Sequence, residues 1–326
     1  MGHCPQKFKL SGFLKLRNKT MKWEKLGIIY KPSGEYSWAN SKAMVPTPYK
    51  LNSDVIRVFC SFCDKDGIGR PGYVDVSAYD PRKIISVSKK PLLDIGSPGS
   101  FDDNGVVVTS IVKNVEGNLY MYYVGFELGV KHRYRLMTGL AISKDNGNSF
   151  ERFSKTPILD RSNDEMLFRG GPYCIYENNI YKMWYVAGSS WINLGGKEFP
   201  VYNLKYIESQ DGINWPNKGK TVLEPKDKDE HGFGRPYVFK KQNGTYSLFV
   251  SVRKKSLKQY RMAYAESKDG IKWKRLDEKL NMDVTPNSFD SEAIMYGAYF
   301  EKDNNSYILY NGNNFGEDGF ALAQKI

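Results

Sequence analysis

Two arginines lie in apolar, strand-like segments and could bind an anion. Arg169 lies in FRGGPYCIY, and Arg235 lies in EHGFGRPYVF. A guanidinium group presents a planar fork of donors that matches phosphate or carboxylate oxygens, so this pair predicts an anionic group on a ligand. The alternative is structural, because buried arginines are usually held in ion pairs, here between neighbouring sheets.

Carboxylates precede two further segments of the same kind. Asp103 lies in FDDNGVVV, and Asp290 and Glu292 lie in FDSEAIMY. A carboxyl group can transfer a proton, so Asp103 and Glu292 are candidate general acids or bases, and Asp290 is a candidate binding residue. Asp-Asn-Gly is also strong turn chemistry, and Glu292 could be a plain surface carboxylate. Both alternatives stay open.

A repeated turn indicates the elements that position these residues. Three segments align: GLAISKDNGNSFERF from residue 139, LKYIESQDGINWPNK from residue 204 and MAYAESKDGIKWKRL from residue 262. Asp-Gly and Asp-Asn-Gly supply the positive φ angles that a tight hairpin needs. Phe150, Trp215 and Trp273 follow the turn, where a large ring can cap the space between sheets. With a weaker copy near Asp80, the repeat recurs about every 65 residues.

The two ends of the chain rebuild one more copy. The chain ends on GFALAQKI, which resembles a repeat cut short, and residues 21–32, MKWEKLGIIYKP, resemble the part that is missing. A second hairpin alternates with the first and occurs five times. We therefore predict an all-β fold, a five-bladed β-propeller with four antiparallel strands per blade, whose last blade is closed by the N-terminal strand. The propeller forms a single domain at 21–326, after an N-terminal extension at 1–20. A β-sandwich would not predict this period.

The SxDGxxW hairpin, seen as ESQDGINW and ESKDGIKW, resembles that of the five-bladed propeller glycosidases. This superfamily includes arabinofuranosidases, invertases and mannoside phosphorylases. The resemblance implies acidic residues at the innermost strands, where one carboxyl protonates the leaving oxygen and a second assists. Asp103 matches the family's aspartate before the second inner strand. Before the third, where many members carry Glu-Gly-Pro, this chain has Arg169, and the first, SWANSKAMVPTP, offers no carboxylate.

This partial match implies a carbohydrate-active enzyme that cleaves or transfers a glycosyl unit, with phosphorolysis or transfer on a phosphorylated or acidic sugar included. Asp103 and Glu292 are the predicted catalytic residues, and Arg169 and Arg235 the predicted anion clamp. The rival hypothesis is a non-catalytic glycan-binding propeller, because a shared fold does not carry an activity with it.

Three other side chains are predicted to bind such a substrate. Trp191 could stack on a sugar face, Asn313 in the tract YNGNNFGEDG could bind hydroxyls, and His231 is one of three histidines. Their structural alternatives are ring packing, a loop that closes the last blade, and a hydrogen-bonded loop histidine. No histidine–carboxylate cluster has metal-ligand spacing, so neither a metal nor a cofactor is predicted.

Composition narrows the class of protein further. The net charge is +12, but the lysines are spread along the chain, which speaks against a nucleic-acid partner and is compatible with an anionic sugar. Four cysteines are too few and too scattered for a disulfide framework, and buried thiols are expected. The sequence shows no signal peptide and no membrane-spanning stretch, so we expect a cytoplasmic protein, acting in the synthesis of a surface polysaccharide.

Overall fold

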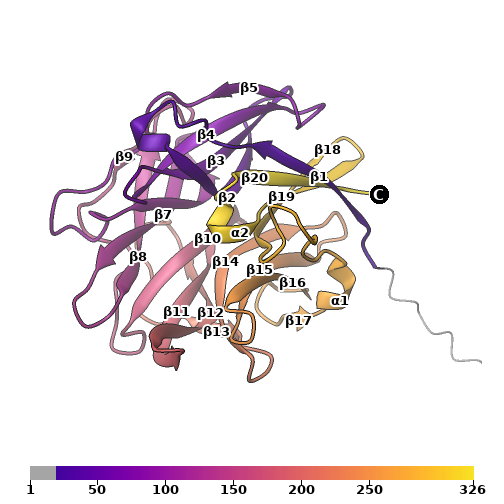
Figure 1. Ribbon diagram of the computed structural model, residues 1–326. Coiled ribbons are helices and arrows are strands. Elements are labelled where there is room, and N and C mark those ends of the chain that lie inside the picture. Colours follow the sequence, from indigo (N-terminus) through magenta and orange to yellow (C-terminus); the bar gives the residue numbers. More distant parts are fainter. Residues whose placement is uncertain (1–19) are drawn as a thin grey trace, which may run out of the picture.

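The computed structural model describes residues 20–326, and the predicted N-terminal extension lies outside the described residues except for its last position. The described chain is built almost wholly of antiparallel strands (Figure 1), which confirms the all-β prediction. Its helical segments are short: η1 (Ser37–Ala39), α1 (Asp277–Leu280) and α2 (Asn313–Gly316). Among the described residues, none of the helices has the length and apolar character needed to span a membrane.

Three of the described sheets have four strands each. They consist of β2 (Ser41–Lys50), β3 (Val55–Cys63), β4 (Gly69–Ser77) and β5 (Ile84–Val87); of β14 (Glu230–Lys240), β15 (Tyr246–Lys254), β16 (Gln259–Ser267) and β17 (Lys274–Arg275); and of β18 (Met295–Lys302), β19 (Asn305–Asn311), β20 (Phe320–Lys325) and β1 (Trp23–Tyr30). In each, strands that follow one another along the chain are neighbours.

The fourth sheet contains eight strands: β6 (Val106–Lys113), β7 (Leu119–Leu128), β8 (Tyr134–Ser143), β9 (Glu151–Arg152), β10 (Phe168–Glu177), β11 (Ile180–Leu194), β12 (Lys197–Ser209) and β13 (Lys220–Leu223). Two successive groups of four meet in it through one parallel pairing, Arg169 with Met137. We call the successive groups β2–β5, β6–β9, β10–β13, β14–β17 and β18–β20 with β1 units 1 to 5.

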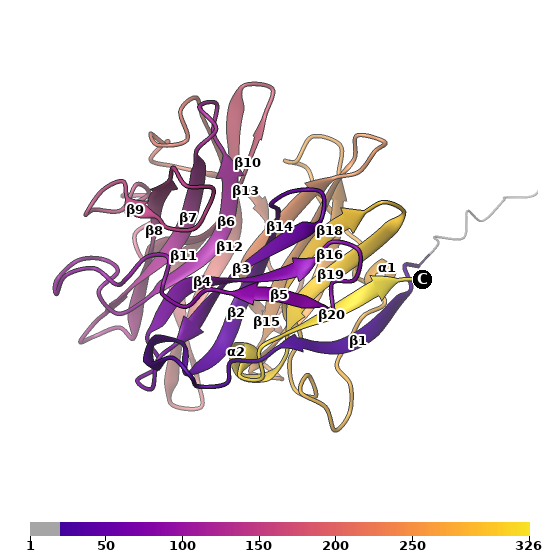
Figure 2. The same cartoon turned by 90° about the horizontal axis from the view of Figure 1, so that it is seen from above.

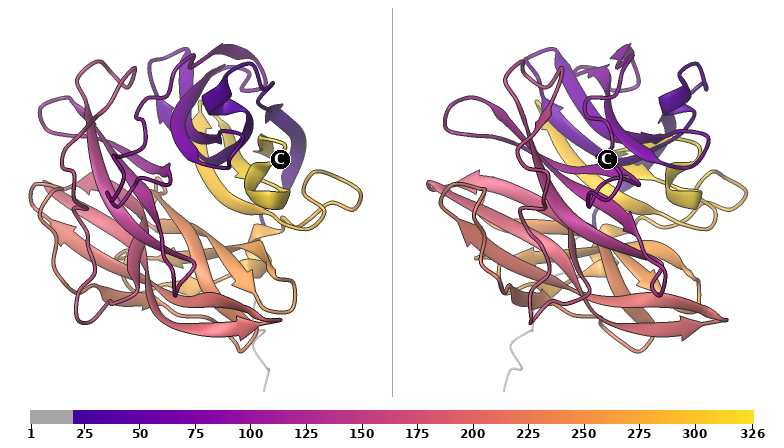
Figure 3. Two further views of the ribbon diagram at one scale, coloured as in Figure 1. Left: turned by 60° about the vertical axis from the view of Figure 1, so that its left-hand side comes forward. Right: turned by 90° about the vertical axis from the view of Figure 1, so that its left-hand side faces the viewer.

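The two ends of the described chain share one sheet. β1 pairs antiparallel with β20, from Trp23 opposite Lys325 to Tyr30 opposite Phe320. Figures 2 and 3 show the indigo β1 beside the yellow C-terminal strands. This confirms the predicted pairing of the chain ends, and it covers an edge of β20 that would otherwise be open.

The first strands of the units form a closed ring of contacts. β2 packs against β6, β6 against β10, β10 against β14, β14 against β18, and β18 against β2. Figure 1 shows β2, β10 and β14 near the middle of the molecule and β5, β9, β13 and β17 near its edge. The predicted count of five blades stays a prediction, because units 2 and 3 are joined in one sheet.

Side chains of the middle strands fill the space between units. β7, with the sequence LYMYYVGFEL, is buried along most of its length. Aromatic and apolar residues suit such a strand, because neighbouring sheets cover both of its faces. The three described free cysteines, Cys60, Cys63 and Cys174, are buried as expected. Cys4 lies outside the described residues.

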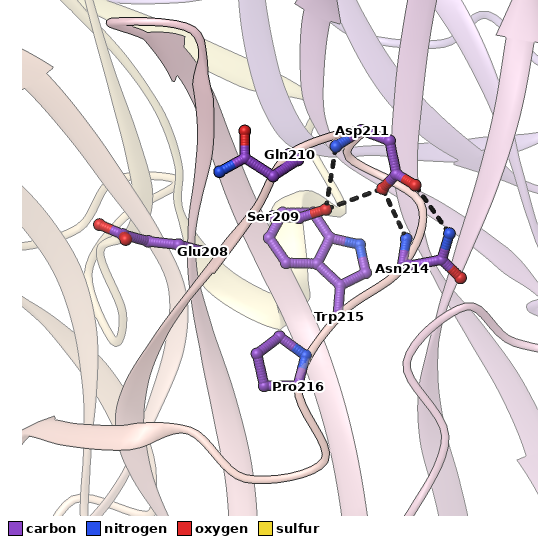
Figure 4. Close-up of a pocket in the computed structure, with 7 residues that line it drawn as sticks. All are labelled: Glu208, Ser209, Gln210, Asp211, Asn214, Trp215 and Pro216. Carbon is purple, nitrogen blue, oxygen red and sulfur yellow. Dashed lines mark hydrogen bonds between the residues drawn. The ribbon is translucent and has the colours of Figure 1, made fainter.

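The repeated Asp-Gly turn has the predicted positive φ, 71° at Gly212 in unit 3, and its carboxylate bonds to the backbone of the turn (Figure 4). In unit 3, the Asp211 carboxylate accepts hydrogen bonds from the backbone N–H groups of Ile213 and Asn214, each at 2.8 Å. The surface hollow of about 440 Å³ beside this turn is lined by residues 208–211 and 214–216. These polar groups bond mainly to one another within the turn, so we interpret the hollow as part of the blade structure.

Each turn also receives a hydrogen bond from the preceding unit. The guanidinium of Arg57 on β3 donates to the Gly147 carbonyl at 3.1 Å. In the same way, Tyr122 on β7 donates to Gly212 at 2.8 Å, and the Trp184 indole on β11 donates to Gly270 at 2.8 Å. We call these contacts the inter-unit staples.

The ring residues that follow the turns complete the same contacts. Their partners are rings on the middle strand of the preceding unit: Phe150 meets Phe59, Trp215 meets Tyr122, and Trp273 meets Trp184, at centroid distances of 6.0, 6.2 and 6.4 Å. The prediction that these rings cap the space between sheets is confirmed.

Candidate ligand-binding cavity

A β-bulge interrupts the first strand of every unit. The pairing register shifts at residues 44–47 of β2, 108–110 of β6, 170–173 of β10, 233–236 of β14 and 295–298 of β18. A bulge bends its strand and re-aims a side chain. Each bulge contributes at least one residue to the lining of a single cavity, among them Val45, Thr109, Gly171, Arg235 and Tyr296.

The backbone around this cavity holds unusual conformations. Val45, Tyr296 and Phe315 have φ angles of 56°, 56° and 61°, although a β-branched or bulky residue rarely adopts a positive φ. All three line the cavity, as does Lys42 with φ of 59°. Strained backbone of this kind persists where the surrounding structure imposes it, and it gathers at binding sites.

The cavity has a volume of about 460 Å³ and mixes aromatic walls with positive charge. Its basic side chains are Lys42, Arg133, Arg235 and Arg253, and its tyrosines are Tyr134, Tyr202, Tyr260 and Tyr296. None of the described residues that line it is Asp or Glu. A pocket with this lining is suited to an anion attached to a flat or apolar body.

Arg235 is the most buried of the four basic residues, with 3% of its surface exposed. Its Nη2 donates to the backbone carbonyls of Pro46 at 3.0 Å and Tyr296 at 2.9 Å, which belong to the bulges of β2 and β18. Nε and Nη1 have no hydrogen-bond partner among the described residues. Burial lowers the pKa of the guanidinium to about 10, so the group remains charged at neutral pH.

Arg253 lies further along the same wall. It is half-buried, and its guanidinium lies over the rings of Phe199 and Tyr260 at 5.1 and 5.0 Å from the centroids. Its Nε is buried and has no hydrogen-bond partner in residues 20–326. Tyr202 and Tyr260 share a hydrogen bond of 3.0 Å beneath it.

The arginines of the cavity differ from all other described arginines. Every arginine in residues 20–326 has a carboxylate within 4.0 Å except Arg133, Arg235 and Arg253, which all line the cavity. Residues 1–19 contain no Asp or Glu that could supply a partner. The described arginines that lack a carboxylate partner are therefore gathered at this cavity.

Of the four charged residues predicted to surround one cavity, only Arg235 does so. The assignment of Arg169 to an anion clamp is corrected. Its side chain is 2% exposed and pairs with Glu165 at 2.6 Å, and its Nη2 donates to the Pro216 carbonyl at 2.8 Å. These bonds hold it within unit 3 and the segment before β10, so Arg169 is held in a buried ion pair, as in the structural alternative considered above, but that pair is local and does not join two sheets.

The two predicted catalytic carboxylates also lie outside the lining of the cavity. The Asp103 carboxylate accepts a hydrogen bond from the Gly99 backbone N–H at 2.8 Å, within the loop before β6. Its neighbour Asn104 does line the cavity. Glu292 is exposed, and its backbone N–H donates to Asn313 at 2.8 Å. The two carboxylates are therefore not brought together at the cavity.

The remaining predicted binding residues have structural contacts. Asp290 is fully buried and pairs with Lys25 of β1 at 2.6 Å. Asn313 accepts backbone hydrogen bonds from Glu292 and Ala293, which fixes the loop before β18. Trp191 is half-buried in the hairpin of β11 and β12. None of the three lines the cavity.

His231 contacts the wall of the cavity through the ring of Phe199. Its imidazole is buried, with Nδ1 at 3.2 Å from the Pro200 carbonyl, and it packs edge-on against Phe199. Burial lowers its pKa, and nearby cations add to the effect, so the ring is neutral at pH 7. The Phe199 ring lies against the Arg253 guanidinium, so His231 supports the cavity wall without lining it.

Arg253 and Arg133 were not predicted as binding residues, because neither lies near the start of the first strand of a unit. Arg253 lies near the end of β15, and Arg133 directly precedes β8. A hairpin brings the end of its second strand beside the start of its first strand. Basic residues near the end of a second strand are therefore also candidates for the lining of the cavity. No group of three or more His, Cys, Asp or Glu in the described part of the chain could hold a metal ion.

Comparison with solved structures places this fold among glycoside hydrolases. One structure, described as a glycoside hydrolase, has a TM-score of 0.73 and 17% identity, with 94% of this chain and 92% of that chain covered. A thermostable family-43 glycoside hydrolase has a TM-score of 0.64 and 15% identity over 90% and 91% of the two chains. A structure from work on the GH130 family of mannoside phosphorylases has a TM-score of 0.63 and 15% identity over 93% and 94%. The predicted resemblance is confirmed for the fold.

The family is defined by closer relatives. The chain is 33% identical over 305 residues to uncharacterized protein Rv1502 of Mycobacterium tuberculosis strain ATCC 25618 / H37Rv, with 93% of this chain and 99% of that protein covered. Uncharacterized protein MT1551 of strain CDC 1551 / Oshkosh matches equally over the same length. The chain belongs to the family of these proteins. No protein-family model matches it.

Proposed function

We propose that the central cavity binds an anionic carbohydrate, either a phosphorylated or an acidic sugar. The observation that carries this proposal is the set of arginines without carboxylate partners, Arg133, Arg235 and Arg253. Arg235 is buried, and a buried charge without a counter-charge is costly, so an anionic ligand would compensate it. The tyrosines of the cavity supply rings for a sugar face and hydroxyls for its polar edge.

The ring of first strands supports five blades around this cavity. The contacts from β2 through β6, β10, β14 and β18 back to β2 return to their starting point, and every one of these strands has its bulge at the cavity. A propeller places the innermost strands of its blades around a central channel. We therefore propose that units 1 to 5 are the five blades.

The lining of the cavity favours binding over hydrolysis by a carboxylate pair. Two carboxyl groups must flank the scissile bond in that reaction, and no described Asp or Glu lines the cavity. Phosphorolysis or glycosyl transfer is the second candidate, and the position of Asp103 beside the cavity residue Asn104 favours it. One carboxyl group could then serve as the acid while an anionic co-substrate occupies the arginines.

Replacing Arg235 by Ala tests the proposal. We expect affinity for the anionic sugar to fall about tenfold to a hundredfold, because a charge-assisted hydrogen bond contributes about 1.5–3 kcal/mol. Isothermal titration would use hexose monophosphates and hexuronates of the gluco, manno and galacto series. Arg235→Lys, which keeps the charge, should retain part of the affinity, and thermal unfolding would confirm that each variant is folded.

The matched control is Arg82→Ala, which removes an exposed arginine paired with Asp80 in its own turn. This variant should bind like the unmodified protein. Equal binding of neutral hexoses, or unchanged affinity in a folded Arg235→Ala protein, would contradict the proposal.

Amide variants of the two predicted catalytic carboxylates separate binding from catalysis. We expect Asp103→Asn and Glu292→Gln to keep the affinity for the anionic sugar, because neither carboxylate lines the cavity. Turnover of aryl glycosides and sugar phosphates, with and without added phosphate, would be measured in parallel. A fall in turnover of about 10²–10⁴-fold in either variant, with unchanged affinity, would instead assign a general acid or base.

A further inference from the structure

The cavity holds two guanidinium groups that reach into it from different directions. Arg235 extends toward the bulge carbonyls of β2 and β18, whereas Arg253 lies over the rings of Phe199 and Tyr260. Each has a buried nitrogen without a hydrogen-bond partner among the described residues, and neither has a carboxylate partner. We propose that the ligand carries two anionic groups, one bound by each arginine, as in a sugar bisphosphate. This inference rests on the proposed function.

The two arginines are anchored on neighbouring strands and have different protein partners. Arg253 pairs opposite Gly232 of β14, and Arg235 lies three positions further along that strand, within the bulge at residues 233–236. Strands rise about 3.3 Å per residue and a bulge bends its strand, so about 10 Å is an upper limit on the separation of the two backbone positions along the strand. Because each guanidinium group has its own protein partners, each can bind a separate anionic group of one ligand.

Tyr296 connects the two arginines electrostatically. The centroid of its ring lies 6.0 Å from that of Tyr260, whose ring is covered by the Arg253 guanidinium. Its backbone carbonyl accepts a hydrogen bond from Arg235. Burial raises the pKa of its hydroxyl, while the positive charges of Arg253 and Arg235 oppose that rise. Both guanidinium groups therefore act on the Tyr296 hydroxyl in the same cavity.

The outer basic residues fit the entry of a ligand with several negative charges. Arg133 is exposed and Lys42 is half-buried, so the positive charges run from the surface toward the buried Arg235. Positive charge along a cleft raises the local concentration of an anionic ligand and its association rate. A dianionic group at each end of one sugar would meet four basic side chains in all.

The experiment compares two probes by isothermal titration with the full chain: hexose 6-phosphates and the corresponding hexose 1,6-bisphosphates. We expect a bisphosphate to bind about tenfold to a hundredfold more tightly than its monophosphate, since it gains a second charge-assisted contact. Arg253→Met should remove this advantage, so that the bisphosphate and its monophosphate bind the variant with equal affinity. Methionine keeps an unbranched apolar chain against Phe199 and Tyr260, so packing is preserved.

The outcomes separate this inference from the proposed function. Equal affinity for the two probes, together with an effect of Arg235→Ala on the monophosphate, would overturn the two-anion inference and leave the anionic-sugar proposal standing. Loss of all binding in a folded Arg253→Met protein would also overturn it, because the two positions would then not be separate. Failure of both probes and of the hexuronates to bind the unmodified protein would overturn both. Recovery of the bisphosphate advantage in Arg253→Lys would support the charge as its cause.

Discussion

Replacing Glu165 by Ala is expected to lower the free energy of unfolding by about 3–5 kcal/mol, because it leaves the Arg169 guanidinium buried without its carboxylate. Glu165 is 1% exposed and pairs with Arg169 at 2.6 Å. It also accepts hydrogen bonds from the Tyr185 hydroxyl at 2.7 Å and the Gly219 backbone N–H at 2.9 Å. Urea denaturation would measure the loss.

The neighbouring residue supplies the control for this prediction. Asp164 also forms an ion pair, with Lys218 at 3.0 Å, but both side chains are half exposed or more. Exposed pairs contribute about 0–1 kcal/mol, so Asp164→Ala should have little effect. If Glu165→Ala were as stable as Asp164→Ala, the buried pair would not be the contact that fixes the segment before β10 to unit 3.

Replacing Trp184 by Ala is expected to cost about 3–5 kcal/mol as well, for a different reason. The indole is fully buried, packs against Trp273 and Tyr206, and forms the inter-unit staple to the Gly270 carbonyl. Its loss leaves a large cavity and an unpartnered carbonyl. Thermal and urea unfolding of the purified variant would measure the change.

A second variant separates the ring from its hydrogen bond. Trp184→Phe keeps an aromatic ring and loses the donor, so it should cost clearly less than Trp184→Ala. Phe153, which is 46% exposed, provides the control, and Phe153→Ala should change stability by no more than about 0.5 kcal/mol. A Trp184→Phe protein as unstable as Trp184→Ala would assign the effect to the staple instead of to packing.

The parts of the fold that depend on local chemistry could be predicted from the sequence. Asp-Gly and Asp-Asn-Gly favour a tight turn by local chemistry, so three copies of the turn and the rings behind them indicated the period. The packing of Trp215 between neighbouring units followed from that period. The pairing of β1 with β20 was predictable too, because the C-terminal segment resembles a repeat cut short and residues 21–32 resemble its missing part.

The site was harder to predict, because a bulge changes which side chains face the cavity. FRGGPY and GFGRPY look alike, yet aligning them on Pro172 and Pro236 puts Gly171 opposite Arg235, and Arg169 falls two positions earlier. One of these arginines therefore lines the cavity, and the other is bonded to Glu165 and Pro216 away from it. The ion-pair partner of Arg169 was equally hidden, since Glu165 lies in the irregular segment before β10.

The pairing of the chain ends also determines how the protein would respond to mechanical force. Trp23 lies opposite Lys325, so the two free ends leave the sheet at the same end of the antiparallel β1–β20 pair. A force that pulls the ends apart acts along the inter-strand hydrogen bonds, which run perpendicular to the strands. The hydrogen bonds between the two strands then break one after another. Under a force parallel to the strands, all of them would bear the load at once. Tension applied through the ends would separate β1 from β20 first and so open the ring of units within unit 5.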